Sequence, residues 1–177
     1  MTPSDHYAEY IRQILRELGL PPMLGRVPFH EADTLVSIGP DIYGREQKLA
    51  PGPAQAWNEM KAAAEKEHVA LLAVSAFRSV AYQRQIIERK LAAGQSMDQI
   101  LRVSAAPGFS QHHTGRAIDI NTPDCQPLTE DFEQTAAFAW LVRRAKEFGF
   151  SMTYPRGNPS GVIYEPWHWA WQENTAS

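Results

Sequence analysis

Cysteine is nearly absent from this chain, since Cys125 is the only one among 177 residues. A single cysteine excludes an intrachain disulfide and a cysteine-rich zinc site, so histidines and carboxylates remain as ligands for any metal. No apolar run approaches the roughly 20 residues that a membrane-spanning helix needs. The first residues, MTPSDHYAEYIRQ, also lack the basic and apolar regions of a signal peptide. We therefore expect a cytoplasmic protein if Met1 is the native start, and a periplasmic or extracellular one otherwise.

Strong charge of either sign is lacking as well. The 17 basic and 20 acidic residues give a net charge of -3, and no dense Lys/Arg cluster is present. This pattern argues against a nucleic-acid partner and against a polybasic membrane-binding surface. A small or peptidic ligand fits better. The length and the 44% hydrophobic content are those of one well-buried core, so we interpret residues 1–177 as one domain and expect a monomer.

Hydrophobic periodicity and Gly/Pro punctuation predict an α+β fold with helices around a small antiparallel sheet. Residues 21–53 are rich in Pro and Gly, which indicates loops and short strands. Helices are expected at 4–19, 54–66, 80–94, 96–102 and 132–148. Strands are expected at 69–74, buried on both faces, and at 115–120. An aromatic-rich pair of strands, in 150–154 and 162–171, is expected to form a hairpin.

The stretch SQHHTGRAID contains two adjacent histidines and an aspartate. In a strand over GRAIDI, the two-residue period puts Asp119 on the face opposite its isoleucine neighbours. A carboxylate within an apolar strand is costly to bury unless it is paired or coordinates a cation. His112, just before the bend at Gly115, can fold back toward the same face. The alternative is that Asp119 bonds backbone groups at a strand end and the histidines are ordinary loop residues, and these ten residues leave both readings open.

A third ligand is available in EPWHW near the end of the chain, where Glu165 and His168 are three residues apart. Pro166 favours extended backbone at the preceding residue, so we expect this pair at the start of a strand. A local bend would then bring both side chains to one site. The alternative is an aromatic core strand whose histidine is satisfied by a neighbour.

Three ordered motifs connect these segments. They are S-x-x-R-S at Ser75, Arg78 and Ser79, S-x-H-x(6)-D at Ser110, His112 and Asp119, and E-P-W-H at Glu165 and His168. Together with the YQ, GF and YP pairs at 82–83, 149–150 and 154–155, they resemble the VanY-type D-alanyl-D-alanine carboxypeptidases. This group of zinc peptidases also includes the D-Ala-D-Ala dipeptidases and the hedgehog-like zinc-binding fold. The resemblance runs from Val69 to Trp171, although SAFRS departs from the commoner SGYRS at two positions. We accordingly divide the domain into an N-terminal helix and loop extension, residues 1–50, and a family-like core, residues 51–177.

The resemblance implies roles for individual residues. His112, Asp119 and His168 would bind Zn²⁺, and Glu165 would act as general base on a zinc-activated water. His113 would then be a bystander or a support for the site. Arg78 would meet a carboxylate or a developing oxyanion, with Ser110 and Gln83 near the substrate. The simpler alternatives are that Arg78 pairs with a structural acid and that Ser110 caps a turn. Tyr154 and Trp167 would form an aromatic wall of the site or part of the core, and we favour the core.

The implied function is removal of the C-terminal D-Ala from peptidoglycan stem peptides or muropeptides. The bond cleaved could be the L,D bond of a tetrapeptide, the D,D bond of a pentapeptide, or both. Two alternatives are kept: a peptidoglycan endopeptidase of the phage-lysin type, and a non-catalytic zinc-binding module. Glu165 argues against the last of these, because a purely structural zinc needs no general base.

Overall fold

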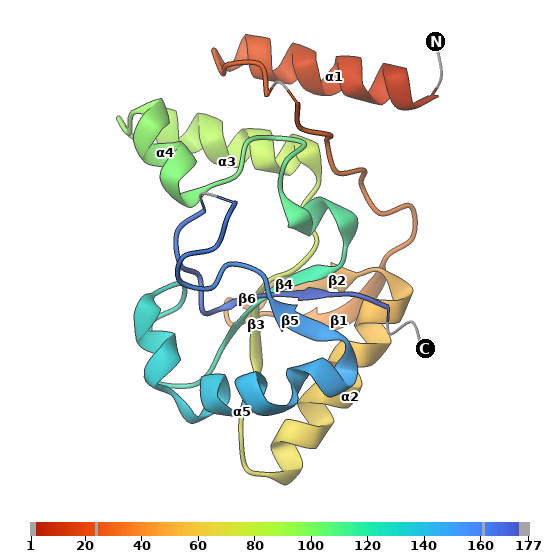
Figure 1. Ribbon diagram of the computed structural model, residues 1–177, viewed down its shortest axis with the longest axis vertical. Helices are drawn as coiled ribbons and strands as arrows, with labels where there is room; N and C mark the ends of the chain where they lie inside the picture. Colours follow the sequence, from red (N-terminus) through yellow and green to blue (C-terminus); the bar gives the residue numbers. More distant parts are fainter. Residues whose placement is uncertain (1–2, 24, 161, 174–177) are drawn as a thin grey trace.

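The computed structural model describes residues 3–23, 25–160 and 162–173. Its centre is a four-stranded antiparallel sheet with the order β3-β4-β6-β5 (Figure 1). The strands are β3 (Leu72–Ser75), β4 (Ala117–Asn121), β5 (Phe150–Met152) and β6 (His168–Trp171). The predicted α+β class with a small antiparallel sheet is confirmed, and the sheet pairs residues as distant in the sequence as Ala117 and Ala170.

Strand β4 organises the sheet, because all five of its residues are buried and it pairs on both sides. Asp119 is the register partner of Ser75 in β3 and of His168 in β6. Directly paired residues of an antiparallel ladder project from the same face of the sheet. The register therefore places an aspartate and a histidine, 49 positions apart in the sequence, side by side on one face.

Two helices cover one side of the sheet, α2 (Pro51–Lys66) and α5 (Ala136–Arg144) (Figure 1). Trp57 and Met60 of α2 and Trp140 of α5 are fully buried in the main core, together with Ile118 and Ile120 of β4. The isoleucines and Asp119 thus face opposite sides of the strand, as the two-residue period predicts. Helix α2 starts at Pro51, three residues before the predicted start, in keeping with the preference for proline in a first helical turn.

A second core lies on the other side, where α1 (Pro3–Glu17), α3 (Val80–Ala92) and α4 (Met97–Val103) are found (Figure 1). Ile11 and Leu15 of α1 pack with Val80 and Phe109 in this cluster. The segment between α1 and α2 contains a short hairpin, β1 (Val36–Pro40) with β2 (Glu46–Leu49), as expected for 21–53. Among the described residues, no helix is both long and apolar enough to cross a lipid bilayer.

Three predicted elements are wrong in detail. The strand expected over 162–171 forms only over His168–Trp171, so Glu165 precedes it. The helix expected over 132–148 is three elements: a 3₁₀ helix η2 (Glu130–Gln134), α5, and a 3₁₀ helix η3 (Ala145–Phe148). Thr135 causes the break, since its backbone is extended and its hydroxyl accepts the amide of Phe138 to cap α5. The strand expected over 69–74 starts only at Leu72, since the Val69 amide donates to the Ala64 carbonyl at the end of α2. This strand, β3, is at one edge of the sheet.

Candidate functional site

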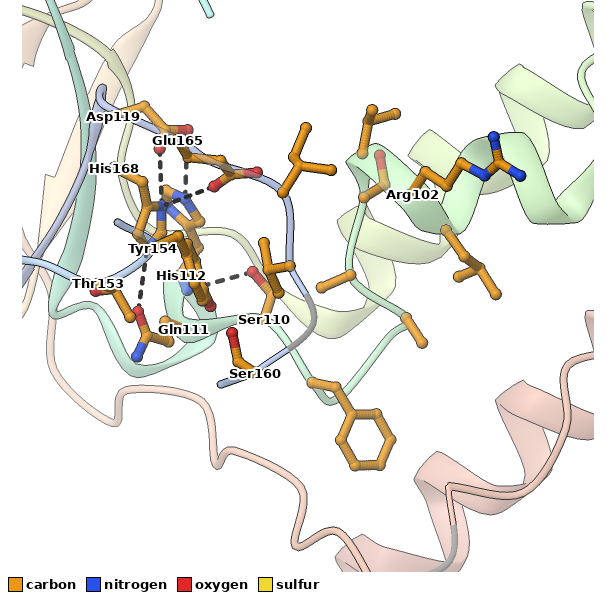
Figure 2. A pocket seen from close by; sticks show the side chains of 18 of the residues that line it. Arg102, Ser110, Gln111, His112, Asp119, Thr153, Tyr154, Ser160, Glu165 and His168 are labelled. Carbon is orange, nitrogen blue, oxygen red and sulfur yellow. Dashed lines mark hydrogen bonds and ion pairs between the residues drawn. The ribbon is translucent and has the colours of Figure 1, made fainter. Parts of the chain in front are cut away.

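A cleft of about 680 Å³ is lined by Asp119, in the middle of β4, and by His168, the first residue of β6. One end of it is lined by the side chains of His112, Asp119, Glu165 and His168, which point toward one another (Figure 2). They come from three places in the fold: the 3₁₀ helix η1 (Gln111–Thr114), strand β4, and the start of β6 with the turn that precedes it. The structure therefore brings together the side chains that the sequence motifs singled out.

Three of these side chains form a candidate metal centre. One ligand atom each from His112, Asp119 and His168 lie within 4.8 Å of one another, and all three residues are buried. Oδ2 of Asp119 is 3.3 Å from Nε2 of His112, and Oδ1 is 3.0 Å from Nδ1 of His168. A tetrahedral zinc site with bonds of about 2.0–2.1 Å separates its ligand atoms by roughly 3.3 Å. The donor set and its spacing thus fit a zinc ion.

The His112 ring is held in the form that a metal ligand requires. Its Nδ1 donates to the carbonyl oxygen of Ala76 at 2.6 Å, which leaves the lone pair on Nε2 facing Asp119. Burial, followed by the positive charge of Arg78, lowers the pKa of His112 to about 4, so the ring is neutral at physiological pH. Burial by itself would raise the pKa of Asp119, but the adjacent histidines lower it well below its usual range. A neutral imidazole and an ionised carboxylate are the forms that bind metal ions.

Gln111 supports His168 from the other side. Its Oε1 lies 3.0 Å from Nε2 of His168. When Nδ1 serves as the ligand, Nε2 carries the ring proton and donates it to this amide oxygen. Sequence reasoning missed Gln111, although it directly precedes His112, because nothing in its local pattern indicates a partner 57 positions away.

Glu165 lies beside the centre without being part of it. The amide of His168 donates to the Glu165 carbonyl at 3.1 Å, which is the local bend that Pro166 predicts. Oε2 of Glu165 lies 3.9 Å from Nδ1 of His168. Burial raises the pKa of Glu165 to about 7; His168 and Arg78 oppose this rise and the charge of Asp119 adds to it. A carboxyl group with such a pKa can both accept and return a proton near neutral pH.

Comparison with known proteins agrees with this geometry. The VanY family, described as D-alanyl-D-alanine carboxypeptidase, matches residues 46–174. The chain belongs to the VanY family. Among curated relatives, it is 35% identical over 118 residues to YodJ of Bacillus subtilis (strain 168), a candidate carboxypeptidase, covering 65% of this chain and 43% of YodJ. The chain thus matches less than half the length of that relative.

A second relative is VanXYC of Enterococcus gallinarum, named as a bifunctional D-Ala-D-Ala dipeptidase and D-Ala-D-Ala carboxypeptidase. It is 28% identical over 153 residues, which cover 84% of this chain and 73% of VanXYC. Among solved structures, the LdcB LD-carboxypeptidase superposes with a TM-score of 0.70 at 31% identity, over 80% of this chain and 69% of that chain. The superposition shows that this chain has the same fold as the LdcB structure.

Within this VanY-family site, His113 is structural. Its Nε2 accepts the amide of Gly108 at 3.1 Å, so Nδ1 carries the proton and donates to the Arg78 carbonyl at 2.6 Å. The Arg78 amide in turn donates to the carbonyl of His112. The histidine pair therefore fastens the SAFRS loop to η1, with one ring toward the candidate metal centre and the other toward the backbone.

Arg78 lines the cleft, and no carboxylate lies within 4.0 Å of it among residues 3–23, 25–160 and 162–173. Its Nε is buried and has no hydrogen-bond partner in that part of the chain. Burial lowers the pKa of Arg78, while the charges of Asp119 and Glu165 oppose this change. The alternative of a structural ion pair therefore has no partner in the described residues, and the guanidinium is available to an anion.

The structure places the other predicted residues differently. Ser110 lines the cleft, and its Oγ also accepts a hydrogen bond from the His112 amide at 3.3 Å, so it caps η1 as the simpler alternative expected.

Gln83 is fully buried, donates to the carbonyl of Ala105 at 2.7 Å, and is not among the described residues that line the cleft. Trp167 belongs to the main core and also lines the cleft. Tyr154 lies in the cleft wall, with its ring centroid 4.8 Å from that of His168.

Proposed function

We propose that this chain is a zinc-dependent carboxypeptidase that removes the C-terminal D-Ala from peptidoglycan stem peptides. The observation that carries the proposal is the meeting of three metal donors, the carboxyl group of Glu165 and the guanidinium of Arg78 in one cleft. The names of the relatives support it: LdcB is an LD-carboxypeptidase, and VanXYC acts on D-Ala-D-Ala. Because the two differ in the bond they cleave, the proposal includes both the L,D bond of tetrapeptides and the D,D bond of pentapeptides.

His112, Asp119 and His168 would hold the zinc ion. Two imidazoles and one carboxylate leave a coordination position free, which distinguishes catalytic from structural zinc sites. When bound, zinc would lower the pKa of a water molecule and polarise a carbonyl group.

The chain's own residues would supply the proton transfers and the orientation. Glu165 would take the proton of the attacking water and give it to the departing amine. Arg78 would bind the terminal carboxylate or the oxyanion, because its planar fork matches either. Ser110 would contribute a hydroxyl group to the same wall, and Tyr154 an aromatic face. Gln83, buried behind this wall, would help to hold the loop at Ala105.

A pair of variants tests the proposal. Glu165→Gln keeps the three donors and removes the proton acceptor, so we expect full zinc content and a loss of turnover of about 10²–10⁴-fold. His168→Ala removes a donor and should lose both zinc and turnover. Zinc content is measured by elemental analysis, and turnover by release of D-alanine from muropeptides. Near-normal turnover by Glu165→Gln would overturn the assigned base.

A further inference from the structure

The cleft continues beyond the candidate metal centre into an arm whose charge is mainly positive. Arg26, Arg78, Lys90 and Arg102 line the cleft, whereas its described carboxylates, Asp119 and Glu165, both lie at the metal end. This excess of positive charge occurs in a chain whose net charge is -3. It is a local feature and does not follow from the overall composition.

The cations of this arm have no carboxylate partner in the part of the chain that the structure describes. No acidic oxygen lies within 4.0 Å of Lys90 or Arg102 there. The contrast with other arginines is clear, since Arg84 pairs with Glu17 and Glu88. Arg84 of α3 is thus paired with acids at the surface. Lys90, near the end of the same helix, has no carboxylate partner in the cleft among the described residues.

Lys90 is the informative member of this set. Its side chain is partly buried, and its Nζ donates to Oγ of Ser104 at 2.7 Å. A hydroxyl group satisfies one of the three ammonium donors and none of the charge. Burial, followed by the charge of Arg78, disfavours the protonated form of Lys90 and lowers its pKa. A partly buried ammonium near a second cation is costly unless an anion enters the cleft.

Arg102 extends the arm away from the metal end. It is exposed near the end of α4, two residues before Ser104, and lies across the cleft from Asp119 and His168 (Figure 2). Since Arg78 would be occupied by the terminal carboxylate or the oxyanion, Lys90 and Arg102 remain available to another carboxylate of the peptide. The arm therefore suits a substrate with a further carboxylate away from the scissile bond.

We infer that Lys90 and Arg102 form a subsite for a side-chain carboxylate of the residue before the cleaved bond. This inference rests on the proposed function and names its substrate class: stem peptides with diaminopimelate, which has a second carboxylate, at the third position. Lysine at that position has the same terminal ammonium but no such carboxylate, so it would bring only positive charge into the arm. The subsite selects the diaminopimelate peptide and repels the lysine peptide.

The test compares peptides that differ only in that carboxylate. The zinc-loaded full chain is given the tetrapeptide L-Ala-γ-D-Glu-X-D-Ala, in which X directly precedes the cleaved bond, with X as diaminopimelate or lysine. Both peptides contain the same D-Glu carboxylate, so the ratio of their kcat/KM values isolates the third residue. We expect the diaminopimelate peptide to be favoured at least tenfold, and the variant Lys90→Met/Arg102→Gln to reduce this preference to below threefold. Lys61→Met, an exposed cation on α2 outside the cleft, is the control and should keep the wild-type ratio.

Binding gives a readout that does not depend on turnover. Calorimetry with zinc-loaded Glu165→Gln should show tighter binding of the diaminopimelate peptide, and the preference should fall as salt is added. If neither peptide is cleaved by the wild type but this binding preference is found, the proposed function fails and the subsite stands. Equal kcat/KM and equal binding for the two peptides would overturn the subsite. An unchanged ratio in Lys90→Met/Arg102→Gln would also overturn it.

Discussion

Replacing Gln111 by leucine tests whether the orientation of His168 depends on its outer hydrogen bond. The substitution removes the oxygen that lies 3.0 Å from Nε2 and keeps most of the side-chain volume. The imidazole N–H, buried at the cleft wall, would then lack its acceptor, at a cost of about 1–3 kcal/mol. Converted at about 1.4 kcal/mol per factor of ten, this predicts a roughly 5- to 150-fold weaker zinc affinity. Outer hydrogen bonds to metal ligands typically have effects of about 10–100-fold, which is consistent with this range.

Zinc affinity is best measured by competition with a chromophoric chelator at fixed pH. Gln111→Glu is the matched control, because it keeps an acceptor oxygen at the same distance along the side chain. We expect the control to bind zinc at least as tightly as the wild type, since the added negative charge faces a metal-bound imidazole. A Gln111→Leu protein within twofold of the wild-type affinity would refute the role assigned to this hydrogen bond.

Two further predictions concern the framework of the site. Gly115→Ala should lower the free energy of unfolding by roughly 1–3 kcal/mol in denaturant titrations. The reason is that φ is 64° at this position and an added Cβ would lie 2.9 Å from the Ala50 amide nitrogen. An unchanged midpoint of unfolding would contradict this prediction. Gln47→Leu should weaken zinc binding severalfold in the same chelator assay. Gln47 accepts the Ala76 amide at 2.9 Å, and the carbonyl of Ala76 in turn accepts the His112 ring proton. Unaltered affinity would show that this chain of bonds does not orient the ligand.

The parts of the site that could be predicted from the sequence are those governed by local periodicity. The two-residue period of a strand placed Asp119 opposite its isoleucine neighbours, and the restriction imposed by Pro166 located the bend that joins Glu165 to His168. Both are properties of a few consecutive residues. The family motifs then connected these segments, which no local argument could do.

The parts that could not be predicted depend on tertiary pairing. The partnership of Gln111 with His168, and that of Gln47 with the Ala76 backbone, arise only once the sheet register is set. The break at Thr135 cannot be seen in the sequence, because the residues on both sides of it continue a helical pattern. In the structure, the Thr135 hydroxyl caps a new helix that begins at the next residue. Gln83 was expected near the substrate from its place in a motif, and its burial behind the cleft wall depends on how α3 packs.

The central claim is tested most directly by mass spectrometry of muropeptides incubated with the zinc-loaded protein, with tetrapeptide and pentapeptide supplied side by side. The account predicts that one C-terminal alanine is lost from at least one of the two. It also predicts that the loss stops when the C-terminus is amidated or when the enzyme is Glu165→Gln. Release of larger fragments from amidated peptides would indicate an endopeptidase instead. Zinc-loaded protein that leaves every muropeptide intact would contradict the account.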